Sequence, residues 1–154
     1  MNSPASTKNS AAEFVEFFAA GWAIGACDPE GFYQHFEQRM HQNAALIQPI
    51  APPSRGPGAL RELFGPLFLA VPDLTGTLRR WGESADGVFI ELTLHGHLGR
   101  KAIEWTVVDR IILEDGKIRE RRSYFDPVPL LRALARRPRA SLPLLFDLVG
   151  RRNH

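Results

Sequence analysis

The residue with the most distinctive chemical environment is Asp109, near the centre of the stretch VVDRIILEDGKIRERRSYFDP. If residues 102–113 form a strand, their side chains alternate between its two faces. The face that carries Asp109 is otherwise built from large apolar residues: Ile103, Trp105, Val107 and Ile111. A lone buried carboxyl group either keeps its proton or finds a polar partner. Asp109 is therefore expected to be a general acid or hydrogen-bond donor in a hydrophobic site, or a structural group that completes the core.

The next predicted strand supplies a candidate partner for this carboxyl group. Arg121, Ser123 and Phe125 alternate along that strand and share one face. Pairing of Arg121 with Asp109 would favour the ionised carboxylate and would weaken the role of acid. Ser123, like Gln48 on an earlier strand, would add a neutral polar group to the same site.

His95 and His97 form an H-x-H pair that would project two imidazoles from one side of a strand. The sequence offers no convincing third ligand, and the pair lies on the face opposite to that of the predicted site. We therefore expect no metal and no organic cofactor. Asp126, before Pro127, is expected to cap a turn.

Length and composition predict one domain, because 154 residues with 44% hydrophobic content can bury one sizeable core. From Val128 onward six arginines face one acid, a balance of +5 that leaves −3 for the preceding residues. A slightly acidic body with a basic end does not resemble a nucleic-acid-binding domain. A solvated basic end is the favoured interpretation, with membrane contact of SLPLLFDLVGRR as the alternative.

The cellular compartment is predicted from two features of the sequence. The single cysteine, Cys27, excludes an internal disulfide and suits a reducing environment. Glu13 and Glu16 interrupt the apolar run that could otherwise be taken for a signal peptide. We expect a cytoplasmic protein.

Periodicity and turn signals predict an α+β domain over residues 10–130, after a disordered lead-in of residues 1–9 and before a basic, helical C-terminal extension of residues 131–154. Helices are expected from Ser10, from Asp28 and from about Pro57. Strands are expected in five segments: Gln42–Pro49, Leu74–Glu83, Val88–Leu98, Ala102–Leu113 and Lys117–Phe125. The last four strands are joined by short turns, which predict an antiparallel meander.

Helices packed on one curled antiparallel sheet leave a cone-shaped gap, and such gaps are common ligand sites. Besides Gln48, Arg121 and Ser123, the residues predicted to line it are apolar: Phe18, Trp22, Leu92, Leu94, Trp105, Val107 and Phe125. The same apolar residues would also build an ordinary core.

This order of elements, with the motifs VVDRIILEDGKI and RRSYFDP, resembles the nuclear-transport-factor-2-like superfamily. The similarity covers roughly residues 10–130 and is strongest to the SnoaL-like and ketosteroid-isomerase-like branch of small cone-shaped domains. Members include isomerases, cyclases, epoxide hydrolases and non-catalytic binding domains, so the fold alone does not choose an activity.

The resemblance carries over unevenly to single residues. Gln48 occupies the position of the catalytic base of ketosteroid isomerases, and Phe18 that of their tyrosine donor. Asp109 aligns with their oxyanion-hole aspartic acid, a carboxyl group kept neutral by an apolar site. The charged triad of limonene epoxide hydrolases aligns with Leu92, Leu94 and Ser123, so hydrolysis of epoxides is not expected.

The resemblance thus implies a cofactor-independent isomerase or cyclase that acts on a small hydrophobic carbonyl compound, polyketide-like or steroid-like. In that case Asp109 would be the general acid or the donor to the oxyanion. The alternative is a non-catalytic ligand-binding or dimerisation domain that has lost the base. The resemblance also implies a homodimer formed through the outer sheet face, near His95 and His97.

Overall fold

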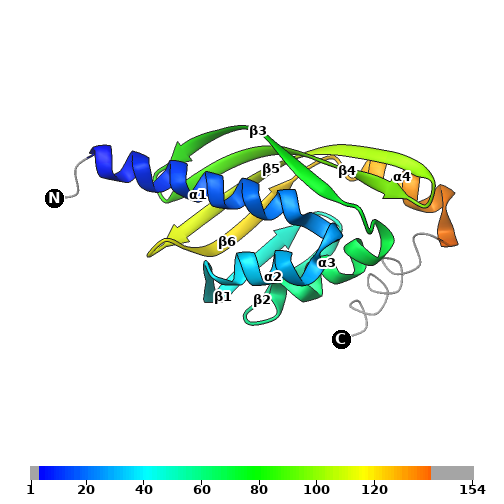
Figure 1. Cartoon of the computed structure of the whole chain (residues 1–154), viewed down its shortest axis with the longest axis horizontal. Coiled ribbons are helices and arrows are strands. Elements are labelled where there is room, and N and C mark those ends of the chain that lie inside the picture. The colour runs from blue at the N-terminus through cyan, green and yellow to red at the C-terminus, as the bar shows by residue number, and fades with distance from the viewer. Residues whose placement is uncertain (1–3, 140–154) are drawn as a thin grey trace.

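The computed structural model describes residues 4–139 of the chain. In this part the chain forms helices around one six-stranded sheet (Figure 1). The helices, including one short 3-10 helix named η1, are α1 (Pro4–Ile24), η1 (Gly25–Cys27), α2 (Pro29–Glu37), α3 (Ala59–Ala70) and α4 (Val128–Arg136). The strands are β1 (Met40–Gln48), β2 (Ala51–Arg55), β3 (Thr75–Ser84), β4 (Gly87–Leu98), β5 (Lys101–Glu114) and β6 (Lys117–Tyr124). The predicted α+β class and the cone-like arrangement are confirmed.

The first helix is longer than predicted, because it begins before Ser10. α1 begins at Pro4, so residues 4–9, which were predicted to be disordered, are helical. Proline is well suited to a first helical turn because its φ angle is already helical. Ser10, from which the helix was expected, therefore lies inside it.

The junction between α1 and α2 requires a glycine. Gly25 has φ of +54°, and a Cβ atom there would collide with the carbonyl oxygen of Leu74. That same oxygen accepts a hydrogen bond of 2.7 Å from the N–H of Ala26. This bond connects the junction to the segment before β3. Asp28, from which the next helix was expected, caps α2, because its Oδ1 accepts a hydrogen bond of 3.0 Å from the N–H of Gly31.

The sheet has the strand order β2-β1-β6-β5-β4-β3. β3 to β6 form the predicted antiparallel meander, but β1 pairs with β6 in parallel, so the whole sheet is mixed. β2 was not among the predicted strands, because the segment APPSRGPG is rich in proline and glycine, which are typical of turns. Its two prolines are tolerated because β2 is an edge strand and needs fewer backbone donors.

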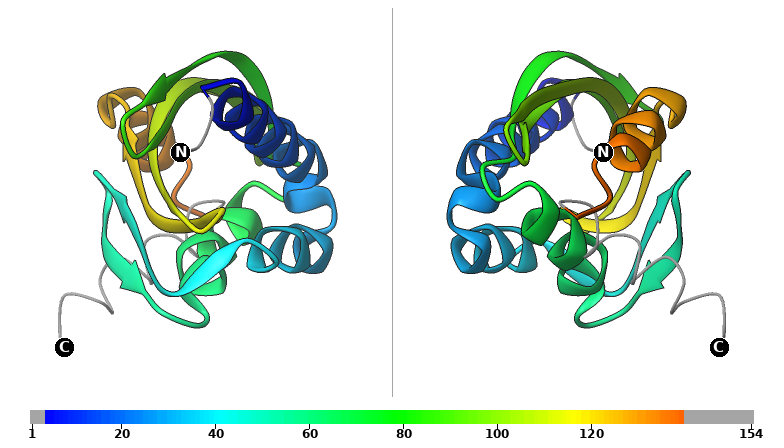
Figure 2. Two further views of the ribbon diagram at one scale, coloured as in Figure 1. Left: turned by 90° about the vertical axis from the view of Figure 1, so that its left-hand side faces the viewer. Right: turned by 90° about the vertical axis from the view of Figure 1, so that its right-hand side faces the viewer.

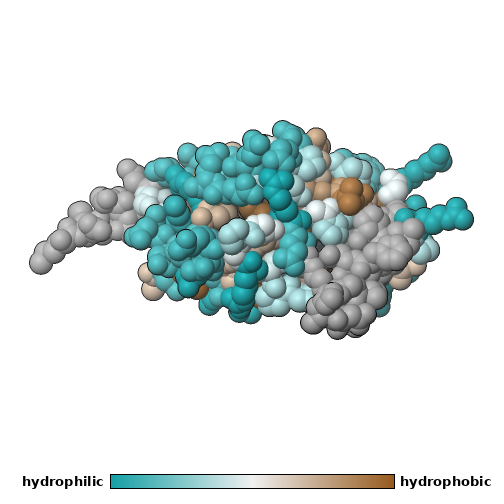
Figure 3. Space-filling model, turned by 90° about the horizontal axis from the view of Figure 1, so that it is seen from below, coloured by the Kyte–Doolittle hydropathy of each residue, from teal (hydrophilic) through white to brown (hydrophobic). Residues whose placement is uncertain are grey.

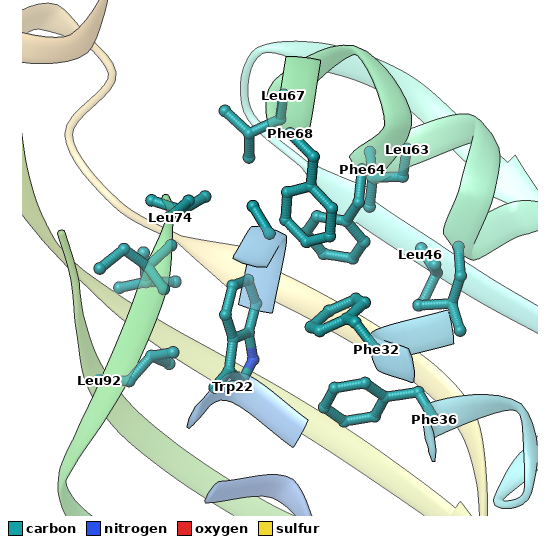
Figure 4. Packing of buried hydrophobic residues seen from close by; sticks show 14 of the residues in the cluster. Trp22, Phe32, Phe36, Leu46, Leu63, Phe64, Leu67, Phe68, Leu74 and Leu92 are labelled. Atoms are coloured by element: carbon teal, nitrogen blue, oxygen red, sulfur yellow. The ribbon is translucent and has the colours of Figure 1, made fainter. Parts of the chain in front are cut away.

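The sheet curls, and α1, α2 and α3 fill its concave side, while α4 lies at the end of the sheet away from the N-terminus (Figures 1 and 2). The core between these layers is rich in aromatic rings (Figure 4). Trp22 packs edge-on against Phe32 and Phe64, with ring centroids 5.2 and 5.5 Å apart. These rings pack next to Arg121, one of the predicted site residues.

The surface seen from below is mainly hydrophilic, with hydrophobic residues in small patches (Figure 3). None of the helices described between Pro4 and Arg139 has both the length and the apolar character needed to cross a bilayer. α4 (Val128–Arg136) spans the predicted start of the C-terminal extension at residue 131. The segment SLPLLFDLVGRR, for which membrane contact was considered, lies outside the described residues.

Candidate functional site

The predicted strand pairing brings three polar side chains together on the inner face of the sheet. Asp109 on β5 lies directly opposite Ser123 on β6, and Ile111 lies opposite Arg121. Arg121 is therefore a diagonal neighbour of Asp109 on the same face. Arg121 Nε donates to Asp109 Oδ2 at 2.7 Å, and Ser123 Oγ donates to Asp109 Oδ1 at 2.6 Å. The pairing of Asp109 with Arg121, considered as an alternative to the acid role, is present.

This triad is almost completely removed from solvent. Asp109 is 0% exposed and Arg121 is 5% exposed. Both carboxyl oxygens of Asp109 accept hydrogen bonds, so neither is turned toward an open space as a donor. A buried ion pair of this kind compensates two charges that would each be costly alone. The carboxylate is thus enclosed by Arg121 and Ser123.

The guanidinium of Arg121 has one donor group to spare. Among the described residues, no acceptor lies within hydrogen-bond distance of its buried Nη1. The guanidinium carbon sits over the ring of Phe64, 5.3 Å from the centroid, and 6.0 Å from the Trp22 centroid. Aromatic faces and Asp109 therefore fix the guanidinium in place while leaving an N–H unused.

A cavity of about 20 Å³ lies beside this guanidinium. Seven residues predicted for the site line it: Gln48, Leu94, Trp105, Val107, Arg121, Ser123 and Phe125. Asp109 does not line it, although its two partners do. A space of this size holds about one water molecule. In this conformation the predicted chamber is therefore filled largely by side chains.

Phe18 and Trp22 lie on the other side of Arg121. Both line a second hollow of about 10 Å³, which Arg121 and Phe64 also border. Leu92 is buried in the core at 1% exposure. The predicted residues thus surround the guanidinium, with the aromatic ones from α1 on one side and the polar ones from the sheet on the other.

Comparison with known proteins identifies the family. Residues 11–121, well over half of the chain, match the model of the SnoaL-like domain. The chain belongs to the SnoaL-like domain family. A search of curated proteins finds no match.

Solved structures of other proteins share the fold. A protein from Jannaschia sp. CCS1, proposed to be a SnoaL-like polyketide cyclase, is 18% identical with a TM-score of 0.72, covering 86% of this chain and 95% of that one. TerC, co-crystallised with polyporic acid, is 19% identical with a TM-score of 0.64, covering 77% and 95%. AclR of Streptomyces galilaeus, a proposed hydroxylase, is 15% identical with a TM-score of 0.64, covering 82% and 98%. At these identities the likeness establishes the fold of the SnoaL-like domain.

Four residues that line the cavity of about 20 Å³ beside Arg121 were not predicted as site residues: Ile50, Phe64, Leu67 and Leu130. Phe64 and Leu67 belong to the helix that was expected from about Pro57, but nothing in their spacing indicates which part of the core α3 covers. Leu130 belongs to α4, and its place at the cavity depends on how that helix folds back onto β5. Packing between elements distant in sequence was the missing information.

The histidine pair lies outside this site. His97 Nδ1 lies 2.6 Å from Asp73 Oδ2, and Asp73 Oδ1 accepts from the His97 backbone N–H at 2.7 Å. His95 Nε2 lies 3.0 Å from Thr75 Oγ1. Between residues 4 and 139, no group of three or more His, Cys, Asp or Glu residues could hold a metal ion.

The Asp73 carboxyl group shows how this outer cluster is stabilised. Partial burial works against its ionisation, but the hydrogen bonds from the ring and backbone of His97 outweigh that effect and lower the pKa of Asp73. Its side chain is 47% exposed and that of His97 is 55% exposed, so solvent reaches both partners. The cluster therefore resembles an ordinary surface ion pair.

Proposed function

We propose that this SnoaL-like domain is a cofactor-independent isomerase or cyclase that acts on a small hydrophobic carbonyl compound. Arg121 binds the carbonyl oxygen and stabilises the enolate that forms from it. Asp109 holds the guanidinium in position, so its contribution to the oxyanion site passes through Arg121. The single observation that carries this proposal is the buried Nη1 of Arg121, which has no hydrogen-bond acceptor among residues 4–139 and belongs to a cavity-lining side chain.

The physical argument rests on the cost of an unused donor. A buried N–H without an acceptor costs about 1–3 kcal/mol, and a charged group costs more. A ligand oxygen beside Nη1 would remove that cost, and a charge-assisted bond would strengthen as negative charge develops on the oxygen. Donors fixed in advance at such a position contribute roughly 10²–10³ in rate in other enzymes.

The remaining cavity residues limit the chemistry. The described residues that line the cavity include no carboxylate, histidine, lysine or tyrosine, and Gln48, at the position of the isomerase base, is not basic. A substrate acidic enough to give its proton to a water molecule, such as a 1,3-dicarbonyl compound, needs an oxyanion site more than a strong base. This favours poly-β-ketone-like substrates over simple ketones. The co-crystallisation of the structural neighbour TerC with polyporic acid fits a fold that accommodates hydrophobic, oxygen-rich molecules.

The test is proton exchange of benzoylacetone in deuterated buffer, followed by NMR at its central methylene. We expect the protein to accelerate exchange and Arg121→Met to lower the acceleration about 10²-fold or more. Arg110→Met is the matched control, because Arg110 lies on the same sheet and also has a buried nitrogen without an acceptor in the described chain, but pairs with Glu120 away from the cavity. Equal loss in both variants would contradict the proposal.

The second candidate is a non-catalytic binding domain, favoured by the absence of a base at Gln48 and of a tyrosine at Phe18. This function predicts that benzoylacetone binds in an Arg121-dependent manner without faster exchange. An ultraviolet shift of the bound enol, with exchange at the rate of buffer alone, would establish it.

We further propose that two chains pair through the outer sheet face. Phe89 and Tyr124 are 41% and 49% exposed there, and Val108 lies opposite Tyr124. Aromatic residues of this kind are enriched in interfaces. Light-scattering mass in solution, compared between the wild type and Tyr124→Glu, checks this expectation.

A further inference from the structure

The cavity beside Arg121 is separated from a larger groove by two side chains. The groove has a volume of about 200 Å³ and lies between α4 and the beginning of β5. Trp105 and Leu130 line both the groove and the cavity of about 20 Å³. These two residues therefore form a shared wall, with the buried guanidinium on one side and an open space ten times larger on the other.

The strand register explains why the groove exists. Pairing of β5 with β6 reaches only to Val108 and Tyr124, so residues 101–107 of β5 extend beyond β6. After β6 the chain turns at Asp126, whose Oδ1 accepts a 3.0 Å bond from the N–H of Val128, and α4 begins. α4 takes the place beside β5 that a strand would otherwise occupy. A helix cannot follow a strand edge as closely as another strand does, which leaves the groove.

We infer that this groove is the subsite for the extended part of the substrate. The inference rests on the proposed function, in which the carbonyl oxygen lies at Arg121. The cavity alone holds about one water molecule, so a substrate must displace the shared wall, and the groove is the space directly behind it. The substrate class is then an elongated carbonyl compound, with its reactive oxygen at Arg121 and its apolar body between α4 and β5.

The chemistry of the groove agrees with an apolar body that ends at a polar rim. Ile103, Pro129 and Ala133 supply apolar walls, while the charged residues Lys101 and Glu104 are exposed. An aliphatic or aromatic extension would bury its surface against these walls, and each buried methylene strengthens binding severalfold. The charged residues at the rim suit a terminal hydroxyl or carbonyl group rather than a further apolar segment.

The inference is tested with a pair of ligands, benzoylacetone and its para-hexyl derivative, by equilibrium titration. Ala102 is exposed and lines the groove, so Ala102→Trp narrows it from a position that suits an aromatic residue in a strand. We expect the hexyl compound to bind the wild type at least about tenfold more tightly than benzoylacetone, and Ala102→Trp to abolish that gain. Lys117→Trp, at an exposed position far along the sheet, is the control and should keep the gain.

The outcomes separate this inference from the proposed function. If benzoylacetone binds through Arg121 but the advantage of the hexyl compound survives Ala102→Trp, the groove is not the subsite and the proposed function stands. If neither compound binds in an Arg121-dependent manner, the proposed function itself fails. Equal losses in the two tryptophan variants would show a general effect of the added ring and would also overturn the inference.

Discussion

Asp109 and Asp73 each pair with a nitrogen donor of another side chain, and their surroundings make the two pairs different. Asp109 is buried with Arg121 and Ser123 on the inner face of the sheet, whereas Asp73 pairs with His97 where about half of each side chain is exposed. Around Asp73, water can satisfy any donor that the protein leaves unused. Around Asp109 solvent does not reach Nη1 of Arg121. A carboxylate paired with a nitrogen donor is therefore a surface contact in one place and part of a potential ligand site in the other.

The comparison predicts that the largest effect follows removal of the inner cation. Arg121→Met should destabilise the fold by about 3–5 kcal/mol, because it leaves Asp109 charged and unpaired in the core. Urea denaturation near neutral pH measures this loss. A cost below about 1 kcal/mol would show that the inner pair behaves like a surface pair and would break the comparison.

The double variant Asp109→Leu with Arg121→Met sharpens the comparison between the Asp109 pair and the Asp73 pair. Replacing both charges of a buried pair with apolar residues is often neutral or stabilising, so stability should return toward that of the wild type. Enolate binding and proton exchange should remain lost. Recovery of stability without recovery of function would indicate that the charged pair is retained for its chemistry rather than for the fold.

A smaller effect is expected from Ser123→Ala. The hydroxyl donates to Asp109 Oδ1 over 2.6 Å, and its removal leaves a buried acceptor with one partner fewer, at a cost of roughly 1–3 kcal/mol. Thr93→Val is a suitable comparison, since Thr93 is also a buried hydroxyl residue, but its Oγ1 accepts a hydrogen bond of 2.9 Å from Arg79 on β3 instead of contacting Asp109. If the Ser123 variant retains full exchange activity at unchanged stability, the hydrogen bond to Asp109 has no role in positioning Arg121.

The inner site was largely predictable from the sequence because strand alternation is a local rule. Alternation alone placed Asp109, Arg121 and Ser123 on one face, and the turns between strands set their register. Alternation could not show that Arg121 would both bind the carboxylate of Asp109 and line the cavity, because that depends on how its side chain packs against Phe64. Leu130 and the groove under α4 depend on where a helix docks after a turn. The Asp73 and His97 pair joins a loop to a strand across 24 positions, and no periodic signal connects them.

The smallest effect is expected at the outer pair. Asp73→Asn should cost only about 0.2–1 kcal/mol of unfolding free energy near neutral pH, because solvent and salt screen this partly exposed pair.

The pH dependence of this effect follows from the pKa of Asp73. That pKa is lowered in the folded state relative to its ordinary value of 3.8, so the carboxylate contributes stability at pH values above 3.8. That contribution disappears as pH falls through the lowered pKa. Unfolding free energies of wild type and variant, measured from pH 7 to pH 3 at low and high salt, should therefore converge toward acid pH. A difference that grows as pH falls would reverse the sign expected from the lowered pKa, and insensitivity to salt would show that the outer pair is protected from solvent as the inner one is.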